Sequence, residues 1–206
     1  MIRPRFALST LLLIAVSLLA GACSPVGMAI GAGATAGIAA SEERGFEGTA
    51  RDAAIRVEIS ELWLDEGFGF YHALELQIYE GRVLLTGRVP SQEMADTAVR
   101  HAWQPDDVTE VINEIEILEG DLAEFATDSL TTAKLRAELT FTRDVRAINY
   151  SIRVVEGIVY LLGVAQDEAE IDRVVRTLRA TSGVRGIVNH VITRDDPRRA
   201  GRDDKS

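Results

Sequence analysis

The sequence predicts an α+β fold built from two tandem domains of α-β-β-α-β order. Each domain is expected to hold a three-stranded mixed sheet covered on one face by two helices. The pattern Glu-Gly-x-Val-x-Leu-x-Gly occurs at residues 80–87 and again 76 positions later, at 156–163. The same offset relates 80–118 to 156–194, where ten of 39 positions are identical. An apolar stripe at helical spacing occurs at matching places in both copies. We therefore infer a tandem duplication.

The repeated eight-residue pattern predicts the turn of a hairpin and its second strand. Its alternating Val and Leu are typical of a strand with one buried face, and its Glu-Gly pair is typical of a tight turn. Gly81 and Gly157 are expected to take a positive φ at this turn, a conformation that a Cβ resists. Gly87 and Gly163 are expected to end the second strand where its backbone passes close to a helix.

The other elements follow from periodicity. The first helix of domain one has a predicted apolar face containing Asp52, Ile55, Ile59, Leu62 and Trp63. The rest of that domain is expected as strands at 74–78 and 83–85, a helix at 91–103 and a strand at 108–117. Domain two is expected as a helix from Asp128, strands at 150–154 and 159–161, a helix at 167–180 and a strand at 184–192. A last strand parallel to its neighbour requires a right-handed crossover.

Several polar residues recur at the same offset. Ser91 and Asp167 are expected to cap the N-termini of the second helices, and Glu170 to complete a capping box with Asp167. Asn113 and Asn189 are expected to hydrogen-bond a loop or a helix end.

The N-terminus predicts a secretory signal peptide at residues 1–22, with two arginines followed by an apolar run. The sequence Leu-Ala-Gly-Ala-Cys at 19–23 resembles the lipobox of bacterial lipoproteins, in which the cysteine becomes the acylated N-terminus. This resemblance implies covalent lipid, such as palmitate, on Cys23, and Ser24 after it favours the outer membrane. An uncleaved membrane helix, or a plain signal with a buried cysteine, remains the alternative.

Domain one is expected at 48–120 and domain two at 125–194. Residues 23–47 are expected to form a tether because 27–37 are uncharged and rich in Gly and Ala; a segment lying on lipid head groups is the alternative. The charged residues 195–206 are expected to form a disordered tail.

The two copies resemble the BON domain. The residues that carry the resemblance are Val154-x-Glu-Gly-x-Val-x-Leu-x-Gly163 and Gly183-Val-x-x-Ile-x-Asn189. Domain one has Glu80-Gly-x-Val-x-Leu-x-Gly87 and Val108-x-x-Val-x-Asn-x-Ile115 in the same places. Signal peptide, lipobox cysteine and two BON domains together resemble the dual-BON outer-membrane lipoproteins of the DolP (YraP) type. The resemblance implies a non-enzymatic envelope protein that faces the periplasm and supports outer-membrane integrity.

In that family the second BON domain binds anionic phospholipid through its first helix. Carried onto this sequence, the resemblance implies a phospholipid-binding surface of Leu130, Lys134 and Arg136. The alternative is that Leu130 belongs to the core and that the two basic residues are ordinary solvated surface.

Charge is distributed unequally between the domains. Residues 47–120 contain five basic and sixteen acidic residues, whereas residues 125–206 contain fourteen basic and twelve acidic ones. An anionic membrane would therefore repel domain one and tolerate domain two. The overall acidity, with a net charge of −10, argues against nucleic-acid binding.

No catalytic or metal-binding motif is present, and the one cysteine is assigned to the anchor, so we expect no enzymatic activity and no cofactor beyond the covalent lipid. Two alternatives to phospholipid binding remain. The acidic first domain would dock a protein of outer-membrane assembly or of the cell wall, or the chain would be an osmotic-stress protein of the OsmY type.

Overall fold

The computed structural model of the protein describes residues 41–117 and 125–199, with the side chains of the second range from Leu130 onward. Residues 42–206 form one compact unit, distinct from residues 1–41. The predicted signal peptide, the anchor cysteine Cys23 and the Gly/Ala-rich segment lie outside the described residues and stay predictions.

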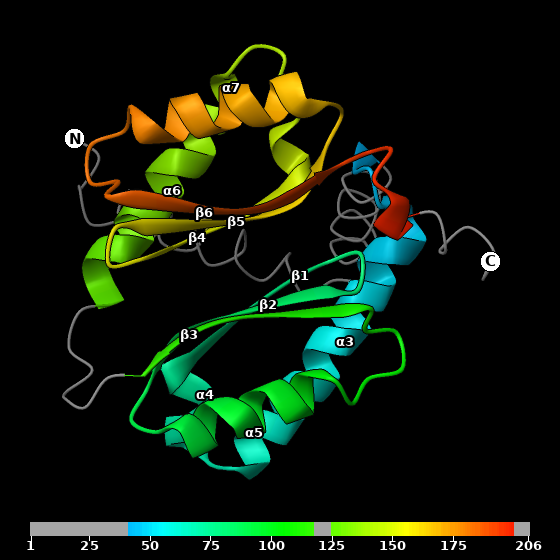
Figure 1. The fold of residues 1–206 in the computed structure, drawn as a ribbon, viewed down its shortest axis with the longest axis vertical. Coiled ribbons are helices and arrows are strands. Elements are labelled where there is room, and N and C mark those ends of the chain that lie inside the picture. Colours follow the sequence, from blue (N-terminus) through cyan, green and yellow to red (C-terminus); the bar gives the residue numbers. More distant parts are fainter. Residues whose placement is uncertain (1–40, 118–124, 200–206) are drawn as a thin grey trace, which may run out of the picture. The chain divides into compact units, whose positions relative to one another are not determined.

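Two domains of the same topology make up the compact unit (Figure 1). The first contains helices α3 (Gly45–Asp65) and α4 (Phe68–Ala73), strands β1 (Leu74–Tyr79) and β2 (Arg82–Val89), helix α5 (Gln92–Ala102) and strand β3 (Glu110–Ile117). The second contains helix α6 (Phe125–Phe141), the 3₁₀ turn η2 (Ala147–Asn149), strands β4 (Tyr150–Val155) and β5 (Ile158–Ala165), helix α7 (Glu168–Arg179), strand β6 (Gly186–Thr193) and the 3₁₀ turn η3 (Pro197–Arg199).

The sheets have the orders β1-β2-β3 and β4-β5-β6, with an antiparallel hairpin followed by a parallel third strand. The predicted α+β fold is therefore confirmed. Helix α4 and turn η2 were not predicted. Both are short, and α4 contains one glycine and follows another, so neither has a helical period long enough to read.

The two hairpins turn through the repeated Glu-Gly pair. Glu80 and Gly81 have φ of 54° and 68°, and Glu156 and Gly157 have φ of 48° and 72°, so both turns are of type I′. The predicted positive φ of the two glycines is confirmed. In domain one, the Asp52 carboxylate of α3 accepts the N–H groups of Glu80 and Gly81, both at 2.8 Å, and thereby holds the turn against the helix.

The second glycine of each repeat does not end its strand, because β2 and β5 continue for two residues beyond Gly87 and Gly163. The predicted close approach is confirmed. A Cβ on Gly87 would overlap the carbonyl oxygen of Ala73, and one on Gly163 would overlap that of Asn149. These two oxygens belong to the last residues of α4 and η2, so the helix end and the strand pack backbone to backbone.

Helices cover the outer face of each sheet. The predicted N-cap residues of α5 and α7 are confirmed. Ser91 accepts the N–H of Met94, and Asp167 accepts that of Glu170. The capping-box prediction is wrong in its second half. The buried Glu170 carboxylate accepts the N–H of Gln166 at 2.7 Å and that of Arg146 at 2.6 Å, so it joins α7 to the segment before β4.

The prediction for the two strand asparagines is also wrong. Asn113 Oδ1 accepts the N–H of Ile115, and Asn189 Oδ1 accepts that of Val191, each at 3.1 Å. Each side chain therefore satisfies a backbone group of its own edge strand, and within residues 41–117 and 125–199 it has no hydrogen bond to a loop or a helix end.

The faces of the two sheets that carry no helices lie against each other (Figure 1). Their apolar contact consists of Tyr79, Leu84, Tyr160, Leu162, Val164 and Ile192, with Ile112, Val155, Ile158 and Val188 packed around them. Both faces of each sheet are thus buried, one under helices and one under the other sheet.

This sheet-to-sheet interface follows an approximate two-fold symmetry within one chain. Glu75 pairs with Arg153 at 2.5 Å, and Gln77 pairs with Ser151 at 2.8 Å; in the duplication, 75 corresponds to 151 and 77 to 153. Glu114 and His190, which are 76 residues apart and so equivalent, contact each other at 2.9 Å. The interface is therefore isologous, like that of a symmetric dimer.

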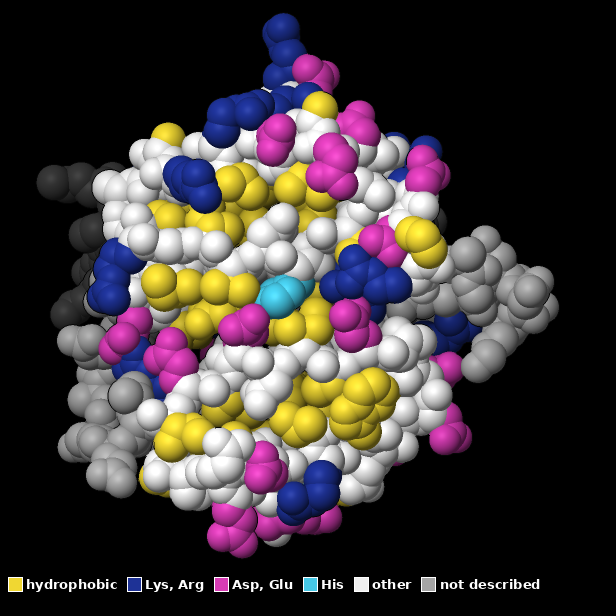
Figure 2. All heavy atoms as spheres, viewed as in Figure 1, with side chains coloured by type: hydrophobic (Ala, Val, Ile, Leu, Met, Phe, Trp, Pro, Cys, Tyr) yellow, Lys and Arg dark blue, Asp and Glu magenta, His cyan; other side chains and the backbone are white. Residues whose placement is uncertain are grey.

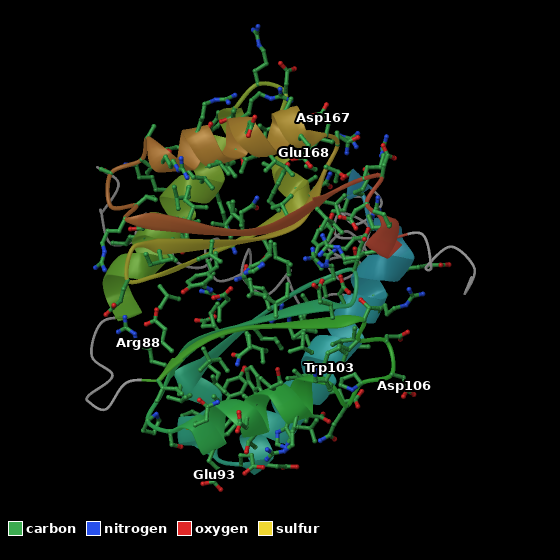
Figure 3. The ribbon with its side chains drawn as sticks, viewed as in Figure 1. Arg88, Glu93, Trp103, Asp106, Asp167 and Glu168 are labelled. Carbon is green, nitrogen blue, oxygen red and sulfur yellow. The ribbon has the colours of Figure 1, made fainter. Side chains whose placement is uncertain are left out.

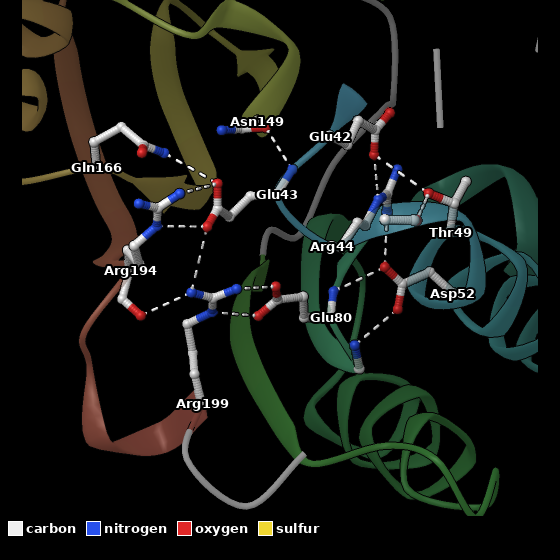
Figure 4. A network of polar contacts seen from close by, with 12 residues as sticks. Glu42, Glu43, Arg44, Thr49, Asp52, Glu80, Asn149, Gln166, Arg194 and Arg199 are labelled. Atoms are coloured by element: carbon white, nitrogen blue, oxygen red, sulfur yellow. Dashed lines mark hydrogen bonds and ion pairs between the residues drawn. The ribbon is translucent and has the colours of Figure 1, made fainter. Parts of the chain in front are cut away.

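The residues just before α3 and those just after β6 meet in a network of charged groups centred on Glu43 (Figure 4). Its carboxylate accepts hydrogen bonds from Arg194 at 2.7 Å and Gln166 at 3.1 Å, and its N–H donates to Asn149 Oδ1 at 2.9 Å. The hydrogen bond from Arg194 lowers the pKa of Glu43 despite an opposing effect of burial. Arg199 completes the network with two hydrogen bonds to Glu80, at 2.7 and 2.9 Å.

This network involves the edges of two segments whose predicted character stays a prediction. Residues 42–47, assigned to the tether, are ordered, and α3 already begins at Gly45. Residues 195–199, assigned to a disordered tail, include η3 and the ion pair of Arg199; residues 200–206 lie outside the described residues.

Candidate functional site

The outer surface of α6 carries two large exposed apolar side chains. Leu130 is 76% exposed and Phe141 is 87% exposed. Leu130, Lys134, Ala137 and Phe141 follow one another at intervals of four, three and four residues, which places them on one side of the helix. The core face of the same helix carries Leu135 and Leu139, which are fully buried. The alternative that Leu130 belongs to the core is therefore wrong.

An open groove of about 650 Å³ lies between α6 and α7. It is lined by Lys134, Ala137, Glu138, Phe141, Thr177, Ala180 and Thr181. Three of the lining residues, Ala137, Thr177 and Ala180, have small side chains, which leaves room for the groove. Polar side chains and the apolar ring of Phe141 thus line the same groove.

Lys134 lies on the rim of this groove. Its Nζ donates to Ser182 Oγ at 3.1 Å, beyond the end of α7, and lies 3.9 Å from Glu138 one helical turn away. The lysine side chain is half exposed, and its ion pair with Glu138 is weak at this distance, so its ammonium is available to an anion.

Arg136 does not share this surface. Its guanidinium donates to the carbonyl oxygen of Ile152 at 3.3 Å, on the edge strand β4. Arg56 of domain one donates at 2.8 Å to the carbonyl oxygen of Leu76, the residue equivalent to Ile152, from a position one helical turn earlier in the repeat. The structure therefore brings Leu130 and Lys134 together and separates Arg136 from them. Sequence reasoning missed Phe141, although its spacing from Leu130 is a multiple of the helical repeat.

The arginines of α7 are only partly paired. Arg173 donates to the carbonyl oxygen of Asp144 at 3.1 Å and lies 4.0 Å from Asp167. Arg176 and Arg179 are exposed and have no ion pair within residues 41–117 and 125–199. Neither of them lines the groove, and the three acids of α7 equal its three arginines in number, so the helix carries no excess of positive charge.

On the face shown in Figure 2, hydrophobic side chains alternate with acidic and basic ones. In domain one, Trp103 at the end of α5 is 52% exposed, and Figure 3 shows it with the neighbouring Asp106. Burial raises the pKa of Tyr79 and of Tyr150 above the ordinary value of a phenol. Among the described residues, no group of three or more His, Cys, Asp or Glu side chains is arranged to hold a metal ion. None of the helices described here is both long and apolar enough to cross a membrane.

Comparisons with known proteins agree with the duplicated architecture. The BON-domain family model matches residues 51–119 and 127–195. An uncharacterised protein in the gshII 5′ region of Anaplasma centrale is 36% identical over 142 residues, which are 68% of this chain and 93% of that protein.

Two relatives have informative names. The osmotically-inducible protein Y (OsmY) of Escherichia coli K12 is 30% identical over 115 residues, 54% of this chain and 57% of that protein. The outer membrane lipoprotein DolP of Haemophilus influenzae is 34% identical over 93 residues, 44% of this chain and 48% of that protein. The match thus spans about half the length of these two relatives. With two family matches and two copies of one fold, the chain belongs to the BON-domain family, as a dual-BON protein similar to DolP and OsmY.

Proposed function

We propose that this protein is a non-enzymatic, lipid-anchored protein of the outer membrane that binds anionic phospholipid through the α6 side of its second BON domain. The observation that carries the proposal is the exposed row Leu130, Lys134 and Phe141 beside the α6–α7 groove. Exposed Leu and Phe side chains partition into the boundary between head groups and acyl chains, and a neighbouring lysine attracts the phosphate.

The lipid anchor and the α6 surface have complementary roles in this proposal. Acyl chains on Cys23 would keep the protein at the membrane, and the similarity to a DolP named as an outer membrane lipoprotein supports that location. Binding by the α6 surface would then orient the second domain toward the lipid. The acidic first domain would be repelled by the same anionic surface.

Co-sedimentation with vesicles tests the proposal. The lipid-free chain of residues 24–206 retains every described element, and it would be mixed with neutral or phosphatidylglycerol-containing vesicles at two salt concentrations. We expect binding to the anionic vesicles only, with weaker binding at higher salt. Lys134→Ala should weaken binding about fivefold, since a basic residue near an anionic surface contributes about 1 kcal/mol.

Matched variants locate the surface. Leu130→Ser combined with Phe141→Ser should weaken binding about tenfold or more, because it removes both apolar contacts. Arg136→Ala should have a smaller effect than Lys134→Ala, because the Arg136 side chain contacts β4. Absence of binding at both salt concentrations, or an equal loss in all three variants, would refute the proposed surface and leave the acyl chains as the membrane contact.

A further inference from the structure

We propose that helix α3 of the first domain docks a basic amphipathic helix of a partner protein. The docking surface is a row of residues on the solvent side of α3, here called the α3 seam: Phe46, Ala50, Ala53, Val57, Ser60 and Leu64. The intervals in this row alternate between four and three residues, which is the spacing of the contact positions in a coiled coil.

The seam is separate from the core face of α3. Ile55, Ile59 and Trp63 are at most 2% exposed and pack on the first sheet. Phe46, Val57 and Leu64 are 59%, 57% and 46% exposed. The helix therefore has two apolar faces, and only one of them is used by the fold.

The duplication supplies an internal comparison. At the positions of Val57 and Leu64, the second domain has Ala133 and Thr140. The BON fold of domain two forms without large apolar side chains at these two places, so folding does not require them in domain one. The middle of the seam has only small side chains, at Ala50, Ala53 and Ser60, so the backbone of another helix can approach it closely.

The length of the seam suits a helix. It covers 46–64 of a continuous 21-residue helix, about 27 Å at the rise of an α-helix. A partner helix of five turns would lie along the whole row.

Charge identifies the chemistry of the partner. Glu47, Glu58, Glu61 and Asp65 form a second row on α3, rotated by about one residue from the seam. All four are exposed, and none has an ion pair within the described residues of the chain. The basic residues of α3 are engaged elsewhere: Arg51 lies 3.7 Å from Asp107, and Arg56 donates to Leu76. An apolar row flanked by free carboxylates fits an amphipathic helix with Lys or Arg beside its apolar face.

The same charges disfavour other occupants. Two copies of α3 would bring two acidic rows together, and an anionic membrane would repel them. The seam is also on a different domain from the lipid surface proposed above, so an experiment can refute either proposal without affecting the other.

A peptide titration tests the seam directly. The probe is a synthetic 21-residue helix with Leu at the contact positions and Lys beside them, and a twin peptide has Glu in place of Lys. Each would be titrated into ¹⁵N-labelled residues 24–206, which retain every described element, and followed by backbone chemical shifts. We expect the Lys peptide to shift the resonances of α3, and the Glu peptide to leave them unchanged.

Variants distinguish binding at the seam from nonspecific binding. Val57→Asp with Leu64→Asp should weaken binding of the Lys peptide at least about tenfold. Glu58→Gln with Glu61→Gln should weaken it about threefold at low salt, as expected for two exposed ion pairs. The controls on the same domain are Trp103→Asp for the apolar change, and Glu93→Gln with Asp106→Asn for the charge change; all three positions are exposed (Figure 3).

Four results would overturn the proposal. They are equal binding of both peptides, shifts centred on α6, equal losses in seam and control variants, and a dimer of the free chain that Val57→Asp disrupts. All variants should keep the melting temperature of the parent chain within a few degrees, because both seam positions are exposed.

Discussion

The carboxylate of Asp52 accepts the backbone N–H of Gly81, 29 residues further along the chain, at 2.8 Å. Its second oxygen accepts the N–H of Glu80, so one side chain holds both central residues of a type I′ turn. Asp52→Ala would leave these two N–H groups without acceptors in a buried place. We expect a loss of about 2 kcal/mol or more in the free energy of unfolding, measured by urea denaturation.

Asp65→Ala on the same helix is the control for this change, because Asp65 is exposed and has no partner in the described part of the chain. If both substitutions changed stability equally, Asp52 would have no special role at the turn.

Gly163 has a second requirement besides its φ of 152°. A methyl group there would overlap the carbonyl oxygen of Asn149, which belongs to the backbone and cannot turn aside. Gly163→Ala should therefore lower the free energy of unfolding by about 3 kcal/mol, measured by thermal or urea denaturation. Gly69→Ala, where a Cβ meets no atom within 4 Å, should change it by less than about 1 kcal/mol. Similar effects of the two substitutions would contradict the close approach.

Glu43 gives stability that depends on pH. Its folded-state pKa is lowered, chiefly by the hydrogen bond from Arg194, so the ionised form is favoured in the folded state. The resulting stabilisation is complete above the unfolded pKa, near 4.5, and is lost as the pH falls through the lower folded value. Glu43→Gln should cost about 1 kcal/mol at pH 7 and progressively less below pH 4.5.

The measurement is urea denaturation of both proteins across this pH range. Glu168→Gln is the control, since Glu168 is an exposed acid on α7 (Figure 3), and its difference from the parent chain should stay small throughout. A Glu43→Gln difference that does not shrink at low pH would show that the carboxylate charge is not the source of the stabilisation.

The pair Glu75–Arg153 joins the two sheets at 2.5 Å, with both side chains about one-third exposed. A double-mutant cycle with Glu75→Ala and Arg153→Ala should give a coupling energy of about 0.5–1 kcal/mol. The double variant Glu75→Ser with Gln77→Ser would serve as a comparison, because it removes the polar side chains that the first sheet contributes to this contact. A coupling energy of zero would contradict a stabilising role of this ion pair between the two sheets.

Much of the fold could be predicted because it follows from local sequence patterns that occur in both domains. The hairpins and the N-caps of α5 and α7 followed from alternation, glycine positions and capping residues, and the parallel third strands agree with the expected mixed sheet. The contact between the sheets was missed, although a signal for it was present. The runs Val83-Leu84-Leu85 and Tyr160-Leu161-Leu162 are continuously apolar, which is typical of strands buried on both faces.

The candidate site could be predicted only in part. The family resemblance led to α6, and the exposure of Leu130 could not be known before the register of the helix on its sheet was set. Lys134 and Arg136 are two residues apart and so point in different directions, yet their contacts with Ser182 and Ile152 depend on tertiary structure. The same holds for the Glu43 network, which joins residues before α3 to residues after β6.

The meeting of Glu114 with His190 has a consequence for the origin of the molecule. In a dimer of identical subunits, a residue near the symmetry axis faces its own copy, so a glutamate there would meet a glutamate. Covalent fusion of two subunits removes this constraint, and the chain places an acid opposite a base. The same freedom extends to the outer surfaces, where one half is strongly acidic and the other carries a slight basic excess. Fusion thus turns a symmetric particle into one with two chemically different ends.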